Sequence, residues 1–160
     1  MTIKEVPYGA TRIPIKKFDI NNMVDYCTIA IIAKRASGKS FLTREIMFQK
    51  KNIVSTIVVS RTEKLNSFYS EFIPDLYIYS EYDSTILTRI FKRQALMNEH
   101  NKERSKKNKK PKDDSLMLIM DDCMSSKGRW LNDPNILELF FNGRHHHISF
   151  ILTMQYSVGI

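Results

Sequence analysis

Short apolar runs alternate with longer polar or amphipathic stretches along most of this chain of 160 residues. The apolar runs are continuous rather than alternating, which is typical of strands that a parallel sheet buries on both faces. They predict five strands, of which Leu76–Tyr79 carries the weakest pattern: Tyr26–Ile32, Thr56–Ser60, Leu76–Tyr79, Leu116–Met120 and Ile148–Met154.

The stretches between these runs predict helices at Lys39–Lys50, Lys64–Phe72, Ser84–Lys102 and Asn135–Asn142. Ser84 is a candidate N-cap for its helix, and the pair Asp133-Pro134 is typical of a helix start. Because strands alternate with helices, we expect an α/β fold with a mostly parallel sheet, flanked by helices and joined by right-handed crossovers.

Two segments lie outside this alternation. Residues 1–24 form an N-terminal lead-in, in which Ile13–Ile15 and Phe18 are candidates for an edge strand of the sheet. From Asn101 to Asp114 the chain is basic and nearly free of apolar residues, which predicts a solvated, mobile loop. Its lysine-rich part, Ser105–Lys112, is a candidate contact for DNA phosphates, but a plain solvated charge run explains it at least as well. We find no linker and expect a single domain over residues 1–160.

The composition limits the location and the partners. A net charge of +8 and a pI of about 9.5 favour a polyanionic partner. Two cysteines, Cys27 and Cys123, are too few for a disulfide framework and favour a reducing interior. The first residues contain no apolar run of the secretory kind, and no run approaches the ~20 residues of a membrane span. We therefore expect neither a secretory signal nor a membrane span.

The segment between the first predicted strand and the first predicted helix carries the strongest chemical signal. It follows the phosphate-loop pattern G-x-x-x-x-G-K-[ST], with Ala33 in place of the first glycine. Gly38 lets the backbone approach phosphates, and successive N–H groups with the helix N-terminus form an anion site. The loop therefore predicts a site for ATP with Mg²⁺ made by Ala33, Lys34, Arg35, Ala36, Ser37, Gly38, Lys39, Ser40 and Phe41.

Two side chains of this loop have distinct expected roles. The Lys39 ammonium would reach the β- and γ-phosphates, and the Ser40 hydroxyl would hold Mg²⁺. The apolar run Leu116–Met120 then ends in two carboxylates, which is the Walker B design. There Asp121 would position Mg²⁺ through its water shell, and Asp122 would polarise the attacking water. An acidic turn that only caps a strand is the alternative for this pair.

Two further residues are candidates for catalysis. Gln155 follows the last predicted strand, where a polar side chain can sense the γ-phosphate and orient water. Arg144 lies just past the end of the last predicted helix, directly before the last predicted strand, and could act as an arginine finger on a neighbouring subunit. A surface arginine near a helix C-terminus is an equally good explanation for Arg144. His145–His147 with Cys123 give only a weak indication of zinc, because adjacent residues on a strand point to opposite faces.

The ordered set of the phosphate loop, LMLIMDDC at 116–123 and GRHHHISFILTMQY at 143–156 resembles a known family. It is similar to the DNA-packaging ATPases of large nucleocytoplasmic DNA viruses, the poxvirus-type virion packaging proteins, within the FtsK/HerA branch of P-loop ATPases. The resemblance covers about residues 25–160. It implies a RecA-like core with the Walker A positions at Lys39 and Ser40, the Walker B pair at Asp121 and Asp122, the sensor at Gln155 and the finger at Arg144.

The resemblance also implies a function for the whole protein. It implies a homo-oligomeric ring that hydrolyses ATP and pumps double-stranded DNA into a preformed viral capsid, in the cytoplasmic viral factory of an infected cell or in the virion. Because the family's cores continue beyond the sensor strand, we expect the core to be truncated at its C-terminus, incomplete after residue 160. A helicase-like P-loop ATPase fits the same motifs. In a non-enzymatic alternative, the chain binds nucleotide without turnover, or folds poorly because its sheet is incomplete. An exposed final strand would then be an unpaired edge prone to association.

Overall fold

The computed structural model describes residues 4–9, 11–16, 18–123, 130 and 132–155. Within these ranges the strands are β1 (Lys4–Tyr8), β2 (Thr11–Ile15), β3 (Thr28–Ile32), β4 (Ser55–Ser60), β5 (Ile78–Tyr79), β6 (Leu116–Asp121) and β7 (Ile148–Met154). The α-helices are α1 (Lys39–Gln49), α2 (Glu63–Asn66), α3 (Ser84–Lys106) and α4 (Pro134–Asn142). Short 3-10 turns are η1 (Ile20–Asn22), η2 (Asp75–Tyr77) and η4 (Gly143–His146).

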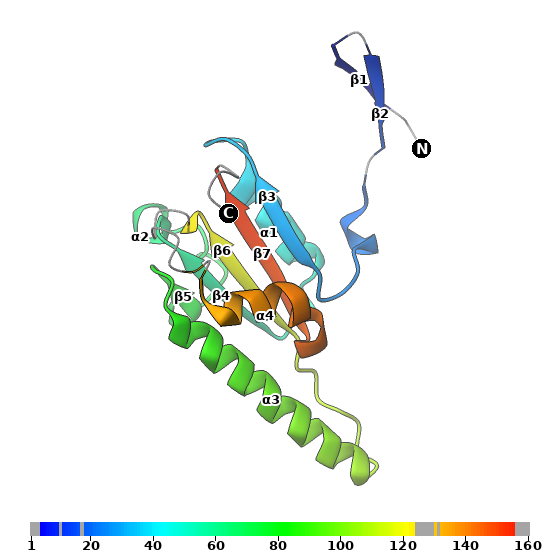
Figure 1. Cartoon of the computed structure of the whole chain (residues 1–160), viewed down its shortest axis with the longest axis vertical. Coiled ribbons are helices and arrows are strands. Elements are labelled where there is room, and N and C mark those ends of the chain that lie inside the picture. The colour runs from blue at the N-terminus through cyan, green and yellow to red at the C-terminus, as the bar shows by residue number, and fades with distance from the viewer. Residues whose placement is uncertain (1–3, 10, 17, 124–129, 131, 156–160) are drawn as a thin grey trace.

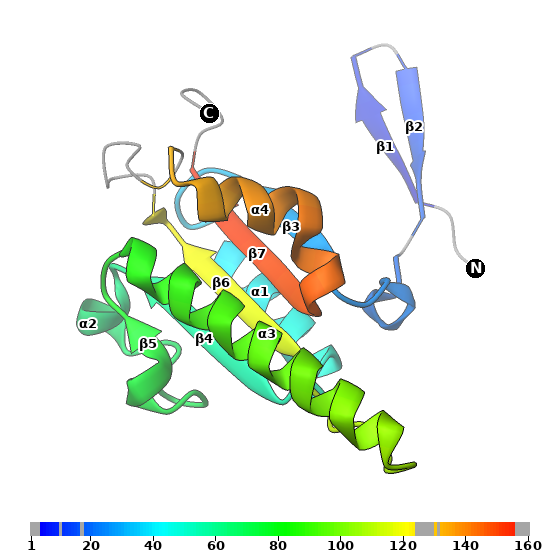
Figure 2. The same ribbon diagram turned by 60° about the horizontal axis from the view of Figure 1, so that its bottom comes forward.

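Five of these strands form one parallel sheet in the order β3-β7-β6-β4-β5. Helix α1 covers one face of the sheet, and α3 and α4 cover the other (Figures 1 and 2). The expected α/β fold with a parallel sheet flanked by helices is confirmed. Because β7 lies between β3 and β6, the last strand ends between the phosphate loop and the paired carboxylates.

The two central strands, β6 and β7, are buried along their whole length. Successive side chains of a strand point to opposite faces, so each strand serves two apolar clusters. In β6, Leu118 and Met120 pack with the cluster under α3 and α4, whereas Met117 and Ile119 pack with the cluster under α1. This double burial explains why both strands read as continuous apolar runs.

Strand β3 differs from the prediction of a core strand buried on both faces. It is the edge of the five-stranded sheet, and its side chains alternate between half-buried and exposed positions. Ile32, for example, is 48% exposed. The final strand, β7, is paired on both sides, so it is not the unpaired edge of the non-enzymatic alternative.

Two helices differ from their predicted lengths. Helix α2 makes only one turn, because Ser67 adopts a left-handed conformation (φ 46°) that ends it. Helix α3 continues through Lys106, since residues beyond Asn101 are polar but contain no glycine or proline before Pro111. The N-cap of α3 is Asp83 rather than Ser84, whereas Asp133 caps α4 as predicted.

The N-terminal segment does not join the main sheet. Strand β2 pairs with β1 in an antiparallel hairpin, with Gly9 at positive φ in the turn. Figures 1 and 2 show this hairpin standing apart from the body of the protein. The predicted edge strand is therefore a strand, but of a separate two-stranded sheet. None of the helices described is both long and apolar enough to cross a membrane.

Candidate nucleotide-binding site

The loop between β3 and α1 has the backbone that an anion site needs. Ala36 and Gly38 both have positive φ, at 58° and 86°, which turns consecutive N–H groups in one direction. Gly38 is the N-cap of α1 and supplies no side-chain cap, so the first N–H groups of the helix stay available to a ligand. Ala33 does not have positive φ, and its N–H donates to the Met154 carbonyl, so this position does not require glycine.

The Lys39 side chain lies back over this loop. Its Nζ donates to the carbonyl oxygens of Ala33 and Lys34, at 2.9 and 3.0 Å. These bonds place the ammonium group beside the backbone that would surround the phosphates. A phosphate entering the loop would therefore meet a positive charge that is already in position.

The Asp121 carboxylate lies at the centre of the site, at the end of β6. Its Oδ2 accepts hydrogen bonds from the Ser40 hydroxyl at 3.4 Å and from the Tyr69 hydroxyl at 3.0 Å. Its Oδ1 accepts a bond from Thr153, the residue opposite it on β7. Asp121 is only 4% exposed, so these three donors satisfy a nearly buried charge.

Asp122 and Gln155 are in direct contact. The Gln155 amide donates to the Asp122 Oδ2 at 2.7 Å, and the Asp122 N–H donates to the Thr153 hydroxyl at 3.2 Å. Asp122 has a left-handed backbone, with φ of 52°, which turns it away from the strand direction of Asp121. The fold thus brings together two residues that the sequence nominated separately for the attacking water.

The oxygen groups at this edge fit a magnesium ion held together with a triphosphate. Mg²⁺ prefers oxygen ligands and is bound through one or two carboxylates plus phosphate oxygens. Ser40 and Asp121, which lie 81 residues apart in sequence, bring a hydroxyl and a carboxylate to 3.4 Å. Together with the phosphate loop they face one cavity of about 450 Å³.

Arg144 lies at the other end of the sheet. It is exposed on η4, directly before β7, whereas the phosphate loop follows the end of β3. Strand β7, with seven residues, separates these two ends by roughly 20 Å, at about 3.3 Å per residue. The fold therefore does not bring Arg144 to the site of its own chain.

Relatives of known sequence are viral proteins. The chain is 40% identical over 146 residues to Uncharacterized protein L437 of Acanthamoeba polyphaga mimivirus, covering 91% of this chain and 51% of that protein. It is 36% identical over 160 residues to Uncharacterized protein 075L of Invertebrate iridescent virus 6, covering 91% and 57%. The chain spans about half the length of the curated relatives it matches. No model of a known protein family matches it.

Solved structures share the fold. The pCW3 conjugation coupling protein TcpA, in its monomer form with ATPγS, superposes with a TM-score of 0.52 at 15% identity, covering 91% of this chain and 46% of that one. The cytoplasmic domain of the Type VII secretion ATPase EccC of Thermomonospora curvata gives a TM-score of 0.50 at 15% identity, covering 91% and 17%. The fold is that of a P-loop NTPase.

Sequence reasoning missed two residues that form the wall of this P-loop site. Tyr69 is 1% exposed, and its buried hydroxyl donates to Asp121. Burial, reinforced by the Asp121 charge, raises the pKa of Tyr69 far above its usual value. Glu63 accepts bonds from the backbone N–H groups of Tyr69 and Ser70 at 2.9 and 2.8 Å. Thr153 was missed as well, although a hydroxyl inside an apolar strand was a signal that could have identified it.

His146, His147 and Cys123 each contact other residues of the protein. His146 contacts Glu138 at 3.0 Å, and His147 contacts Asp114 at 2.7 Å. Cys123 is 1% exposed and donates to the Val59 carbonyl, and burial raises the pKa of its thiol to about 12. Within the described part of the chain, no group of three His, Cys, Asp or Glu residues could hold a metal ion.

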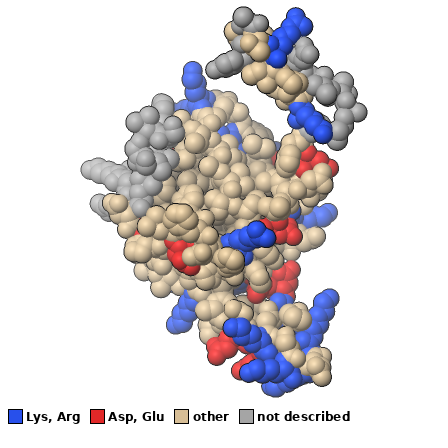
Figure 3. All heavy atoms as spheres, turned by 45° about the vertical axis from the view of Figure 1, so that its right-hand side comes forward, with Lys and Arg blue, Asp and Glu red and all other residues tan. Residues whose placement is uncertain are grey.

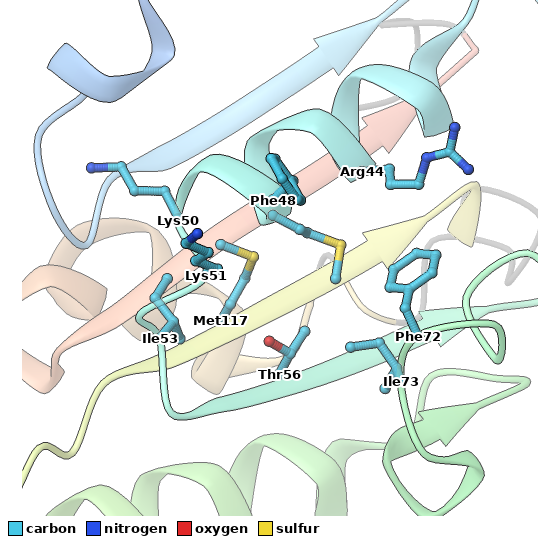
Figure 4. Close-up of a pocket in the computed structure, with 10 residues that line it drawn as sticks. Arg44, Phe48, Lys50, Lys51, Ile53, Thr56, Phe72, Ile73 and Met117 are labelled. Atoms are coloured by element: carbon cyan, nitrogen blue, oxygen red, sulfur yellow. The ribbon is translucent and has the colours of Figure 1, made fainter.

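A second cavity, of about 390 Å³, lies beside α1. Figure 4 shows Met117 and Thr56 on the sheet below it and Phe72 beside them. Of the cationic side chains around it, Lys50 is paired with Asp25 at 3.0 Å and Arg44 lies 4.9 Å from the Phe41 ring centre. None of the residues nominated for catalysis or metal binding lines this cavity, so we treat it as separate from the candidate site.

Proposed function

We propose that this chain binds ATP with Mg²⁺ and hydrolyses it. The observation that carries the proposal is that Asp121 meets the phosphate loop and its Ser40 on one cavity, although Asp121 lies 81 residues away in sequence. The P-loop NTPase fold supports it, because the fold places these groups at the carboxyl ends of the strands, where such folds bind ligands.

The residues divide the chemistry between them. The loop N–H groups and Lys39 would hold the phosphates, while Ser40 and Asp121 would hold the magnesium ion. When bound, Mg²⁺ would neutralise charge on the phosphate oxygens. The oxygen of a water molecule would bond to the γ-phosphorus as the bond to the bridging oxygen of ADP breaks. Asp122, held by Gln155, would accept the proton of that water.

Arg144 fits this reaction only in trans. It is exposed and lies at the opposite end of the sheet from the phosphates of its own chain. In a homo-oligomeric ring the same residue of a neighbouring copy could face the γ-phosphate, where a guanidinium stabilises the developing charge. We therefore propose a ring in which each site is completed by its neighbour.

The end of α3 is the surface best suited to DNA. Figure 3 shows blue side chains gathered at the bottom of the molecule, where α3 ends in Figure 1. The basic tip comprises exposed cations at Lys102, Lys106, Lys107, Lys109, Lys110 and Lys112, with half-buried Arg104 among them. The Asn101 side chain bonds both the N–H and the carbonyl of Lys112, which ties the far side of the loop to the helix.

We propose that the work done by hydrolysis is translocation of double-stranded DNA into a viral capsid. The viral relatives and the basic tip support this role. DNA phosphates bind clusters of lysine and arginine in a salt-dependent way. The activity of the whole protein, its capsid partner and its place in the infected cell or virion are part of the same proposal.

Phosphate release with and without double-stranded DNA tests this function. We expect ATP hydrolysis that DNA stimulates and that Lys39→Ala abolishes, because the variant lacks the charge beside the phosphates. Lys51→Ala, which removes an exposed lysine near the end of α1, is the matched control and should keep the wild-type rate. A rate of hydrolysis that neither DNA nor Lys39→Ala changes would overturn the proposal. Hydrolysis that requires Lys39 but does not respond to DNA would support ATP hydrolysis and contradict DNA translocation.

A further inference from the structure

Among the described residues, Tyr69 is the one donor to the Asp121 carboxylate that comes from outside the sheet and the phosphate loop. Tyr69 is 52 residues away from Asp121 in sequence and belongs to the segment that follows α2. Its hydroxyl donates to the Oδ2 of Asp121, the same oxygen that faces the Ser40 hydroxyl. A buried side chain is thus aimed at the atom that shares the proposed metal site.

The backbone around Tyr69 is fixed by a buried carboxylate. Glu63 is 8% exposed, and its two oxygens accept bonds from the N–H of Tyr69 at 3.0 and 2.9 Å. One of these oxygens also accepts the N–H of Ser70 at 2.8 Å. Phe68 and Phe72 pack edge-on against the Tyr69 ring, with ring centres 5.0 and 6.0 Å away. The ring therefore has backbone and side-chain supports that hold its hydroxyl toward Asp121.

The segment that contains Tyr69 also lines the candidate site. Thr62, Glu63 and Tyr69 line the same cavity as Gly38, Lys39 and Ser40. Of the three donors to Asp121, Ser40 is the proposed metal ligand, which leaves Thr153 and Tyr69 to orient the carboxylate. Partners of this kind, which bond a metal ligand rather than the metal, set ligand orientation and affinity.

We propose that Tyr69 is a positioning residue for magnesium, which holds Asp121 so that its Oδ2 faces Ser40, and that Glu63 holds Tyr69 in place. The inference rests on the proposed function, since it concerns how the same site takes the metal of Mg·ATP. It predicts that loss of the Tyr69 hydroxyl weakens the binding of Mg²⁺ at the site and leaves the binding of nucleotide unchanged.

A second tyrosine provides a matched control. Tyr82 also donates its hydroxyl to a carboxylate, that of Asp133, the N-cap of α4. Tyr82 and Asp133 are not among the residues that line the candidate site. Tyr69→Phe and Tyr82→Phe therefore remove the same kind of tyrosine–aspartate bond, but only the first removes it from the proposed metal site.

The experiment titrates Mg²⁺ against the protein at saturating ATPγS and follows the unfolding temperature, which rises when a ligand binds the folded state. We expect Tyr69→Phe to raise the Mg²⁺ concentration at the midpoint by about tenfold, the low end of the effect of losing such a partner. The stabilisation by ATPγS in EDTA should be unchanged. Tyr82→Phe should lower the unfolding temperature without moving the Mg²⁺ midpoint.

The outcomes separate this inference from the proposed function. A wild-type protein that ATPγS and Mg²⁺ fail to stabilise would overturn both. A wild-type protein that responds, with a Tyr69→Phe midpoint equal to that of the wild type, would overturn only the role of Tyr69. If Tyr69→Phe does not fold, Glu63→Gln decides instead, because it loosens the backbone of Tyr69 and keeps the hydroxyl. A raised Mg²⁺ midpoint in that variant supports the proposal, and an unchanged one overturns it.

Discussion

The two ends of the parallel sheet present their charges in opposite ways. Where β6 and β7 end, short polar side chains are bonded to one another, with Asp121 satisfied by three hydroxyl donors. Where the same strands begin, long cationic side chains of the basic tip extend into solvent. The first arrangement fixes a few atoms to within a hydrogen bond, whereas the second spreads positive charge over a broad surface.

This difference suits the two ligands that we propose for these ends, Mg·ATP and DNA. A site that binds a metal and phosphates gains from groups held in place before the ligand arrives, because no reorganisation is then needed during reaction. A surface that binds a polyanion needs only a density of charge, because its affinity comes largely from released counterions. Helix α3, which ends in the basic tip, is nevertheless bonded to the segments that precede β6 and β7. The Gln94 amide of α3 donates to the carbonyls of Asp114 and His146 at 2.9 and 2.6 Å.

The largest effect is expected at the fixed end, from Asp121→Asn. Asparagine keeps the size of the side chain and loses the charge that Ser40, Tyr69 and Thr153 surround. We expect phosphate release at saturating ATP to fall by roughly 10²–10³, as when a preorganised electrostatic group is lost. The control is Asp113→Asn, which removes an exposed carboxylate beside the basic tip and should leave the rate within about twofold. Equal rates in the two variants would contradict the assignment of Asp121.

The parts of this structure that sequence predicted are those fixed by local pattern. The limits of β7 match the predicted strand Ile148–Met154 because that strand is apolar on both faces. The prediction of a phosphate loop, which awaits a binding test, likewise uses only local pattern, since Gly38, Lys39 and Ser40 must be consecutive to surround a phosphate. A pattern of this kind needs no knowledge of what lies across the fold.

The parts that sequence missed depend on single side chains far apart in the chain. The predicted helix Lys64–Phe72 ends after one turn, since Ser67 takes positive φ and Glu63 captures the backbone of Tyr69. Nothing in the pattern of apolar positions reveals the hydrogen bonds from the Tyr69 N–H to the Glu63 carboxylate. The contact between Tyr69 and Asp121 follows from these bonds, so it too was out of reach of a sequence-only argument.

The next largest effect is expected at the basic end. Replacing four lysines of the tip by glutamate, at Lys106, Lys107, Lys109 and Lys110, should weaken binding to a DNA duplex by more than tenfold. It should also lower the slope of log affinity against log salt by about 0.9 for each DNA phosphate that the protein no longer neutralises. Fluorescence anisotropy at several salt concentrations measures both quantities.

The control for this experiment has the same net charge. It carries glutamate at four exposed lysines spread over the molecule, Lys16, Lys51, Lys64 and Lys92. If both quadruple variants lose the same affinity, net charge rather than the basic tip binds DNA, and the contrast between the two ends disappears. Stabilisation by ATPγS should persist in both variants, because neither changes the phosphate loop.

A smaller effect is expected from Thr153→Val, which tests how far the fixed end depends on its hydroxyl network. The Thr153 hydroxyl is fully buried, donates to Asp121 and accepts the N–H of Asp122. Its loss should lower the free energy of unfolding by about 1–3 kcal/mol, the cost of leaving buried polar groups unpaired. Thr43→Val is the control, since among the described residues the equally buried Thr43 hydroxyl bonds only a carbonyl of its own helix. Urea unfolding curves that place both variants together would show that the network adds nothing.

The smallest effect concerns α3, the helix that joins the two ends. Asp83 caps its N-terminus near the site end, and Arg104 and Lys106 lie in its last turn at the basic end. The negative charge at the start of the helix and the positive charges at its end both interact favourably with the helix dipole.

Hydrogen bonds from the Thr85 hydroxyl and N–H lower the pKa of Asp83. A lowered folded-state pKa means that ionised Asp83 stabilises the fold above its unfolded pKa, roughly pH 4, and that this stabilisation is lost as pH falls through the folded pKa. Asp83→Asn keeps a capping oxygen without the charge, so its unfolding temperature should lie slightly below that of the wild type at neutral pH and converge with it in acid. A gap that stays constant from neutral pH to below pH 4 would show that the charge of Asp83 contributes nothing.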